Sequence, residues 1–294
     1  MRNDPGCARP GRRALALLAL SVLVTACSLT SMAYNHATRL ITWKIDEFFS
    51  LDAGQDAEVR MRLDRVLAWH RARQLPDYAR FLGQVRDRLR GPVTPADVAW
   101  LYGEVKQRID PLIDAAAPEA AAFVKTLRLE QIRELERRFD RTNERFRGKY
   151  LDPAPERVRE AFLKGAQERV EYWFGAFDAA QHRRLAEAAE QIPFDPRLVQ
   201  QDIARRQVEL AAILSAAVQG RPAAEVEHDL RRYFGRPEEG RTPEYARYLE
   251  RQRAAMHRFD AAAANLATEP QRQRALRRLQ GFIDDFGVLA REDG

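Results

Sequence analysis

EAAAFVKTLRLEQIRELERRFDRTNERFRGKY, residues 119–150, is the longest periodic segment of this sequence and sets its fold class. Apolar side chains recur there every three or four residues, which is the spacing of one face of an α-helix. They are Val124, Leu127, Ile132, Leu135, Phe139, Phe146 and Tyr150. Charged residues at i, i+4 spacing, such as Glu130 and Glu134, occupy the other side. The segment is expected to form one long amphipathic helix.

The rest of the chain shows the same periodicity. Earlier helices are expected over 34–49, from Asp52 to a break at Leu75-Pro76, over 77–89, and from Thr94 to a kink or end near Pro111. No stretch shows the β-branched alternation of a strand. The later helices are expected over 156–175, 178–191, 196–218, 222–234, 243–266 and 269–290. The sequence therefore predicts an all-α bundle of about nine to ten helices.

A break in the pattern divides the predicted bundle into two packed halves. The run KYLDPAP, residues 149–155, ends the long periodic segment with two prolines. We expect an N-terminal helical half over 34–150 and a C-terminal helical half over 151–294. In the first helix Trp43 falls outside the apolar face. It is expected to pack in a second helix layer, and a place at lipid headgroups is the alternative.

The N-terminus has the pattern of a bacterial lipoprotein signal. Four arginines precede an apolar run, residues 14–24, that is too short to cross a hydrocarbon core of about 30 Å. Small residues then precede a cysteine in Val24-Thr25-Ala26-Cys27. We expect a signal peptide over 1–26, fatty acyl chains such as palmitate on Cys27, and a short tether over 27–33. A plain secretory signal with a chance cysteine is the alternative.

The N-terminal pattern indicates a location in the cell envelope, and the charge and hydropathy patterns argue against nucleic-acid binding and against further membrane spans. Lipidated Cys27 would hold the protein at the periplasmic face of a cell-envelope membrane, and Ser28 favours the outer membrane by the sorting rule of enteric lipoproteins. The first 26 residues hold four arginines and one aspartate, so the remaining residues keep +3 of the net charge of +6. Their charges are interleaved along every helix, so no nucleic-acid partner is expected. No later segment is apolar enough to span a membrane.

Three predicted helix starts share one form. An apolar or small residue, an Asp or Thr cap and a Gln three positions later occur as Leu51-Asp52-x-x-Gln55, Phe177-Asp178-x-x-Gln181 and Ala267-Thr268-x-x-Gln271. This is a capping box, which helix physics alone can explain. The form also resembles the Leu-Thr-x-x-Gln motif of small helical periplasmic stress chaperones, although no copy keeps both Leu and Thr.

Other segments carry a resemblance over nearly the whole mature chain. They are the lipobox, Tyr34-Asn35 followed by Trp43, the run from Trp69-His70-Arg71 to Tyr78, and the run from Glu171 to Asp178. Together they resemble a family of helical Gram-negative lipoproteins of unknown function. The resemblance implies a lipid on Cys27 and a cell-envelope location. It implies no active site, because that family has none established.

No catalytic or metal-binding constellation is recognisable. The histidines at 36, 70, 182, 228 and 257 lack close metal-ligand spacing, and no nucleophile elbow, Walker loop or dinucleotide fingerprint occurs. No catalytic residue, metal or cofactor is therefore expected. His70, between Trp69 and Tyr78, is expected to bond a helix end, or alternatively to shape a pocket. Trp173 and Phe174 beside Gly175 are expected in the core, with a ligand platform as the alternative.

Three hypotheses follow. The leading one is a non-enzymatic envelope protein that binds a protein partner or unfolded chains. Its candidate ligand or partner surface consists of Trp69, His70, Tyr78, Gln55, Gln181 and Gln271. The alternative is a lytic-transglycosylase-like enzyme, which needs two carboxyl groups facing across a groove and usually a Glu-Ser pair, absent here. The third is a small-lipid carrier, which needs an internal apolar cavity.

Overall fold

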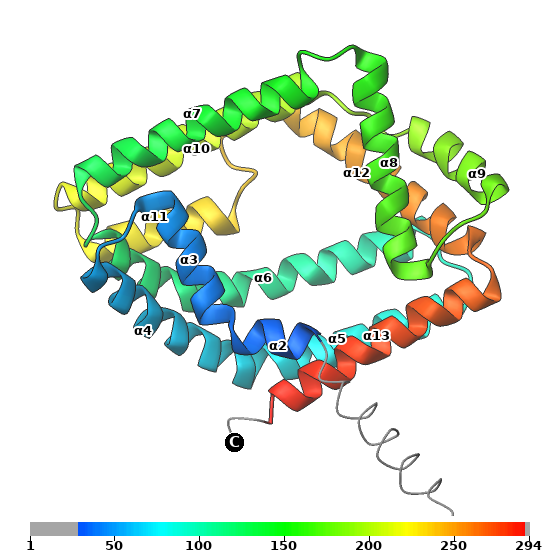
Figure 1. The fold of residues 1–294 in the computed structure, drawn as a ribbon, viewed down its shortest axis with the longest axis horizontal. Coiled ribbons are helices and arrows are strands. Elements are labelled where there is room, and N and C mark those ends of the chain that lie inside the picture. The colour runs from blue at the N-terminus through cyan, green and yellow to red at the C-terminus, as the bar shows by residue number, and fades with distance from the viewer. Residues whose placement is uncertain (1–28, 292–294) are drawn as a thin grey trace, which may run out of the picture.

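The computed structural model describes residues 29–291, and this part of the chain is helical without any strand, as predicted (Figure 1). The predicted signal peptide and Cys27 lie outside the described residues. None of the described helices is long and apolar enough for a membrane span. The helices are α2 (Leu29–Asn35), α3 (Ala37–Phe49), α4 (Ala53–Trp69), a π-helical turn (His70–Gln74), α5 (Leu75–Leu89), α6 (Pro95–Val124), α7 (Leu129–Tyr150), α8 (Pro155–Phe174), α9 (Ala179–Glu190), α10 (Pro196–Val218), α11 (Ala223–Gly235), α12 (Pro243–Leu266) and α13 (Glu269–Leu289).

The expected boundaries from α8 onward are confirmed to within a residue or two, whereas several earlier ones were wrong. Residues 119–150 do not form one helix, because the chain turns between α6 and α7 at residues 125–128. α6 continues through both Pro111 and Pro118 instead of ending near Pro111. Residues 29–33, expected in a tether, belong to α2. Trp43, expected in a second helix layer, is 63% exposed.

The expected break at Pro76 is absent because a π-helical turn precedes it. The Leu75 N–H bonds to the His70 carbonyl, five residues back. This wider turn leads directly into α5. Pro76 stands in the first turn of α5, where its missing backbone N–H costs no hydrogen bond within the helix. α4 and α5 therefore follow each other without a loop.

Four helix starts meet in pairs through glutamine side chains. In the first Gln junction, Gln55 of α4 and Gln131 of α7 exchange two amide hydrogen bonds with N···O distances of 3.0 and 2.8 Å. In the second Gln junction, Gln181 of α9 and Gln271 of α13 do the same at 2.8 and 3.2 Å. Each amide oxygen also accepts the N–H of its own helix's cap residue. The three predicted capping boxes are confirmed, and Gln131 supplies a fourth.

Each glutamine also donates to a carbonyl in the segment that precedes its partner's helix. The acceptors are the carbonyl oxygens of Thr126, Ser50, Leu266 and Ala176, each two residues before a cap, at 2.7 to 3.3 Å. Every amide donor and acceptor is thus used, which allows these polar groups to be buried. The two junctions are equivalent in geometry although they share little sequence.

The two halves of the chain interlock. The turn at residues 151–154 separates α7 from α8, at the predicted boundary. However, α13 packs along α5, and α10 and α11 pack along α7 and α6 (Figure 1). The core at the first junction contains Val59 and Leu135 from one half with Leu214 and Leu230 from the other. The second core gathers around α8, α9, α12 and α13.

Candidate binding pocket

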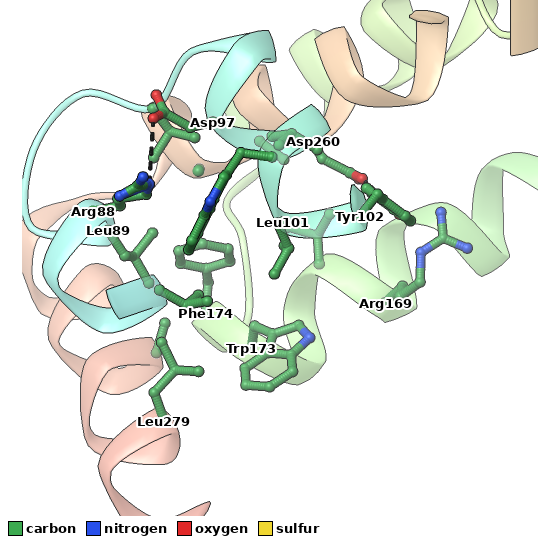
Figure 2. Close-up of a pocket in the computed structure, with 18 of the residues that line it drawn as sticks. Arg88, Leu89, Asp97, Leu101, Tyr102, Arg169, Trp173, Phe174, Asp260 and Leu279 are labelled. Carbon is green, nitrogen blue, oxygen red and sulfur yellow. Dashed lines mark hydrogen bonds and ion pairs between the residues drawn. The ribbon is translucent and has the colours of Figure 1, made fainter. Parts of the chain in front are cut away.

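An apolar pocket of about 320 Å³ opens beside the second Gln junction (Figure 2). Residues from α5, α6, α8, α12 and α13 line it, together with Val93 of the loop between α5 and α6. Trp173 and Phe174 come from the end of α8, Leu101 from α6 and Leu279 from α13 (Figure 2). Phe174 and Phe177 are buried in the second core, as expected, and Trp173 packs against it. Trp173 and Phe174 also line the pocket, so the alternative of a ligand platform stays open.

Alanines explain why this junction contains a pocket and the first does not. Counted from the cap residue of α7 or α13, equivalent positions hold large side chains at the first junction and alanines at the second. The pairs are Phe123 and Ala263, Val124 and Ala264, Leu127 and Ala267, and Leu135 and Ala275. The four large residues fill the first core. Ala263, Ala264 and Ala275 line the pocket instead, because a methyl group leaves the neighbouring space open.

Polar side chains occupy one side of the pocket. The Tyr102 hydroxyl donates to the Asp260 carboxylate at 3.2 Å, and Arg169 lies next to this pair (Figure 2). Burial raises the pKa of Asp260 above its usual 3.8, and the nearby positive charge of Arg169 opposes this shift only in part. Arg169 is exposed and forms no ion pair with a carboxylate in the described range. This side therefore offers both hydrogen-bond donors and acceptors.

On the opposite side of the pocket, an arginine side chain stacks on a tryptophan ring. The Arg88 guanidinium lies over the Trp100 ring, 3.7 Å from its centroid, and 3.8 Å from an Asp97 carboxylate oxygen. Asp97 also closes the capping box of α6, so hydrogen bonds from Thr94 lower its pKa. Asp97 is therefore committed to the fold, whereas Asp260 faces the pocket with a raised pKa.

The loop between α5 and α6, residues 90–94, is held in place by the second junction's helices. Arg272 of α13 donates to the carbonyls of Leu89 and Gly91 at 2.8 and 2.9 Å. Asn265 of α12 bonds both the N–H and the carbonyl of Val93, at 2.9 and 2.7 Å. These contacts fix the pocket walls before any ligand binds, which lowers the entropic cost of binding.

The glutamines expected on a partner surface are instead committed to the fold. Gln55 and Gln181 are only 4% and 8% exposed, and Gln271 is half-buried. Their amide groups make the junction hydrogen bonds, Gln55 with Gln131 and Gln181 with Gln271, and so are not available to a partner. Gln131 was missed because its cap residue is Arg128, which is not among the usual cap types.

His70 and Tyr78 come together with Tyr34 and Phe286, away from the pocket. The Tyr34 hydroxyl lies 2.8 Å from His70 Nδ1, and the His70 and Tyr78 rings meet edge to face. Tyr78 in turn contacts Phe286 of α13. Burial lowers the pKa of His70, which favours the neutral ring in its hydrogen bond with Tyr34; the Tyr34 hydroxyl also donates to the Leu67 carbonyl at 3.3 Å. The cluster joins α2, the π-helical turn, α5 and α13, and Trp69, the preceding residue, is half-buried.

A second, polar groove of about 540 Å³ lies between α6 and α11 and includes His228. Its carboxylates mostly pair with cations: Asp114 with Arg231, Glu238 with Lys106, and Glu239 with Arg236. The described residues contain no group of three or more side chains suited to a metal ion. Hydrogen bonding and the charge of Lys106 lower the pKa of Glu238 in this groove, the opposite of what a general acid needs.

Comparison with known proteins places the chain in an uncharacterised group. Residues 47–246 match DUF6279, a family of unknown function. The matched region contains the whole first Gln junction and Gln181, while α13 lies beyond it. No curated protein and no solved structure matches the chain.

Proposed function

We propose that this chain, which belongs to DUF6279, a family of unknown function, is a lipid-anchored, non-enzymatic protein of the bacterial cell envelope that binds an apolar segment of a protein partner. The apolar pocket beside the second Gln junction carries this proposal. The expected lipid on Cys27 supplies the location, with Ser28 favouring the outer membrane.

The size and lining of the pocket suit apolar side chains. An engineered cavity of about 150 Å³ holds benzene, so 320 Å³ accommodates roughly two aromatic rings. Ligand pockets in proteins begin at about 300 Å³ and combine apolar walls with a few polar groups. Trp173, Phe174 and Leu279 supply such walls, and Tyr102 with Asp260 supplies the polar groups.

The polar side favours a peptide over a lipid headgroup. A peptide backbone presents donors and acceptors together. Arg169 can meet a carbonyl, and the Asp260 carboxylate can accept an N–H. A phosphate would gain from Arg169 but would be opposed by ionised Asp260. This complementarity supports a protein partner, which the leading sequence hypothesis also favours.

Filling the pocket tests the proposal. Ala263→Phe and Ala264→Val together install the residues that stand at the equivalent positions of the first junction. A photoreactive amino acid at Tyr102, which is 49% exposed, reports what enters the pocket in living cells. Val208→Phe, at a site 71% exposed on α10, is the matched control.

We expect a discrete crosslinked protein that disappears in the filled variant and persists in the control. The filled variant should also bind an apolar fluorescent dye at least tenfold more weakly, with an unchanged circular dichroism spectrum. A crosslink to phospholipid alone would replace the partner by a lipid. Cleavage of purified glycan strands that is lost in Asp260→Asn would replace binding by catalysis.

Removing the thiol tests the anchor separately. Cys27→Ala should release the protein from membranes, because acyl chains at about 0.8 kcal/mol per buried methylene supply most of the binding. A variant that still sediments with membranes after a high-salt wash would contradict the lipid-anchor proposal, whatever the pocket binds.

A further inference from the structure

Large apolar side chains are exposed on α2 and α3. Met32, Leu40 and Trp43 are 55%, 48% and 63% exposed. The helix is interrupted at His36, whose φ of −106° and ψ of 10° are not helical, and α2 and α3 meet at an angle (Figure 1). Within α3, Leu40 and Trp43 stand three residues apart and therefore share one side of that helix. We name Leu40 and Trp43 the outer α3 face; Met32 lies on the neighbouring α2.

The other side of α3 is fixed to the protein. Ile45, Phe48 and Phe49 pack against the first core, and Thr42 is 1% exposed. The Thr38 hydroxyl donates to Asp64 of α4 at 2.6 Å. The helix cannot rotate to bury the outer α3 face without losing these contacts, so that face stays available for an external surface.

We propose that the outer α3 face lies on the surface of a phospholipid bilayer, with Trp43 among the headgroups. Trp is enriched at this depth because its ring is both apolar and polar. A helix that presents one apolar side and a polar remainder lies in the interfacial plane. This inference rests on the lipid anchor of the proposed function, because Cys27 precedes α2 by only two residues.

The anchor and the outer α3 face together orient the domain. Trp43 follows Cys27 by 16 residues in the sequence. Acyl chains at Cys27 and the side chain of Trp43 would give the domain two attachment points on the membrane. A lipid alone would leave the domain free to tilt about its attachment.

The chemistry around the outer α3 face favours lipid over a protein interface. Arg39 is exposed on the same side, where a long cationic side chain reaches phosphate groups, whereas Lys44 pairs with Glu47 at 2.7 Å. Two large side chains on α3 are far fewer than the roughly 20 to 30 residues that each partner contributes to a stable interface. A shallow, single-row contact is sufficient for a membrane, because the acyl chains supply most of the affinity.

Quenching by brominated phospholipids tests the contact. The lipidated full-length protein is reconstituted into vesicles whose acyl chains carry bromine near the headgroup, and Trp fluorescence is compared with unbrominated vesicles. Trp43→Phe removes the proposed contact, and Trp69→Phe, at a half-buried Trp on α4, is the matched control. We expect bromine-dependent quenching in the wild type and Trp69→Phe, and at least a threefold loss of it in Trp43→Phe.

Equal quenching in the two variants would overturn the proposal. Trp43 fluorescence that depends on protein concentration and not on bromine would assign the face to a second copy of the chain, and would also overturn it. Intact mass reports the acyl chains on Cys27. A mass without them would remove the anchor and this contact together. Trp43→Phe should leave the Tyr102 crosslink unchanged, so the membrane contact and the pocket can fail separately.

Discussion

The two Gln junctions share one hydrogen-bond pattern and differ in what surrounds it. At the first, Phe123, Val124 and Leu135 close the core around the buried amide pair. At the second, alanines stand at the same positions and a pocket remains. The amide pair therefore forms in the same geometry whether large side chains or alanines stand at these positions of α6 and α7 or α12 and α13. Because the amide pair does not depend on what fills the space around it, the first Gln junction can contribute to stability and the second can contribute to binding.

Exchanging core residues between the junctions should give the largest effect. Leu135→Ala makes the first junction resemble the second and should lower the free energy of unfolding by about 2–5 kcal/mol, because Leu135 is 2% exposed and its loss leaves a cavity. Ala275→Leu makes the reverse exchange into existing space. It should cost less than about 2 kcal/mol, since overpacking is limited where a pocket is available. Urea unfolding measures the free energy of unfolding of both variants. Equal losses for Leu135→Ala and Ala275→Leu would show that the pocket cannot accommodate a larger side chain.

Truncating the junction amides should give the next largest effect. Gln131→Ala leaves Gln55 with an unpaired buried amide, so the free energy of unfolding should fall by roughly 1–3 kcal/mol. Gln271→Ala should lower the free energy of unfolding by less. Gln271 is half-buried, so water can take its place as the hydrogen-bond partner of Gln181. Gln219→Ala, at an exposed site, is the control.

A double-mutant cycle separates the amide pair from the caps. Gln55→Ala combined with Gln131→Ala should cost clearly less than the sum of the two single changes, because both remove the same pair of hydrogen bonds. Simple additivity would mean that the two glutamines act only as independent capping residues.

The comparison also shows what the sequence can and cannot predict. The helices, most of their ends and three of the four glutamine caps follow from periodicity and capping rules. The break before α7 does not, because Leu127 keeps the apolar spacing and Arg128 hides the cap. The pocket was not predictable either. Alanine is common in helices, so these alanines do not by themselves indicate a pocket. Only the alignment of the two junctions shows that they replace large core residues.

Asp260 should make the second junction sensitive to pH. The equivalent position at the first junction is Ala120, which cannot ionise. Burial raises the pKa of Asp260 above 3.8, so the folded state holds the proton more tightly than the unfolded state. Stability from this group is therefore full at low pH and falls as pH rises from about 3.8 through the folded pKa.

Asp260→Asn removes this dependence. The variant should be more stable than the wild type at pH 7, with the gain shrinking towards pH 4, and Asp152→Asn at an exposed site should show no such trend. Urea midpoints between pH 4 and 8 measure the difference. A gain that is constant across this range would indicate that ionised Asp260 carries no burial cost.

The smallest expected effect concerns the one cap that differs from the others. Arg128→Thr gives the first junction the Thr cap of the second and restores the sequence Leu-Thr-x-x-Gln at residues 127–131. It removes the ion pair between Arg128 and Asp52, whose side chains are 52% and 48% exposed, so the loss is at most about 1 kcal/mol. A Thr hydroxyl that caps α7 should return a similar amount. The net change should therefore stay within about 1 kcal/mol, while the wild type alone loses stability as salt rises to 1 M. A large loss at low salt would show that Arg128 joins the helices across the junction through its ion pair, whereas the cap residue at the equivalent position of the second junction is the uncharged Thr268.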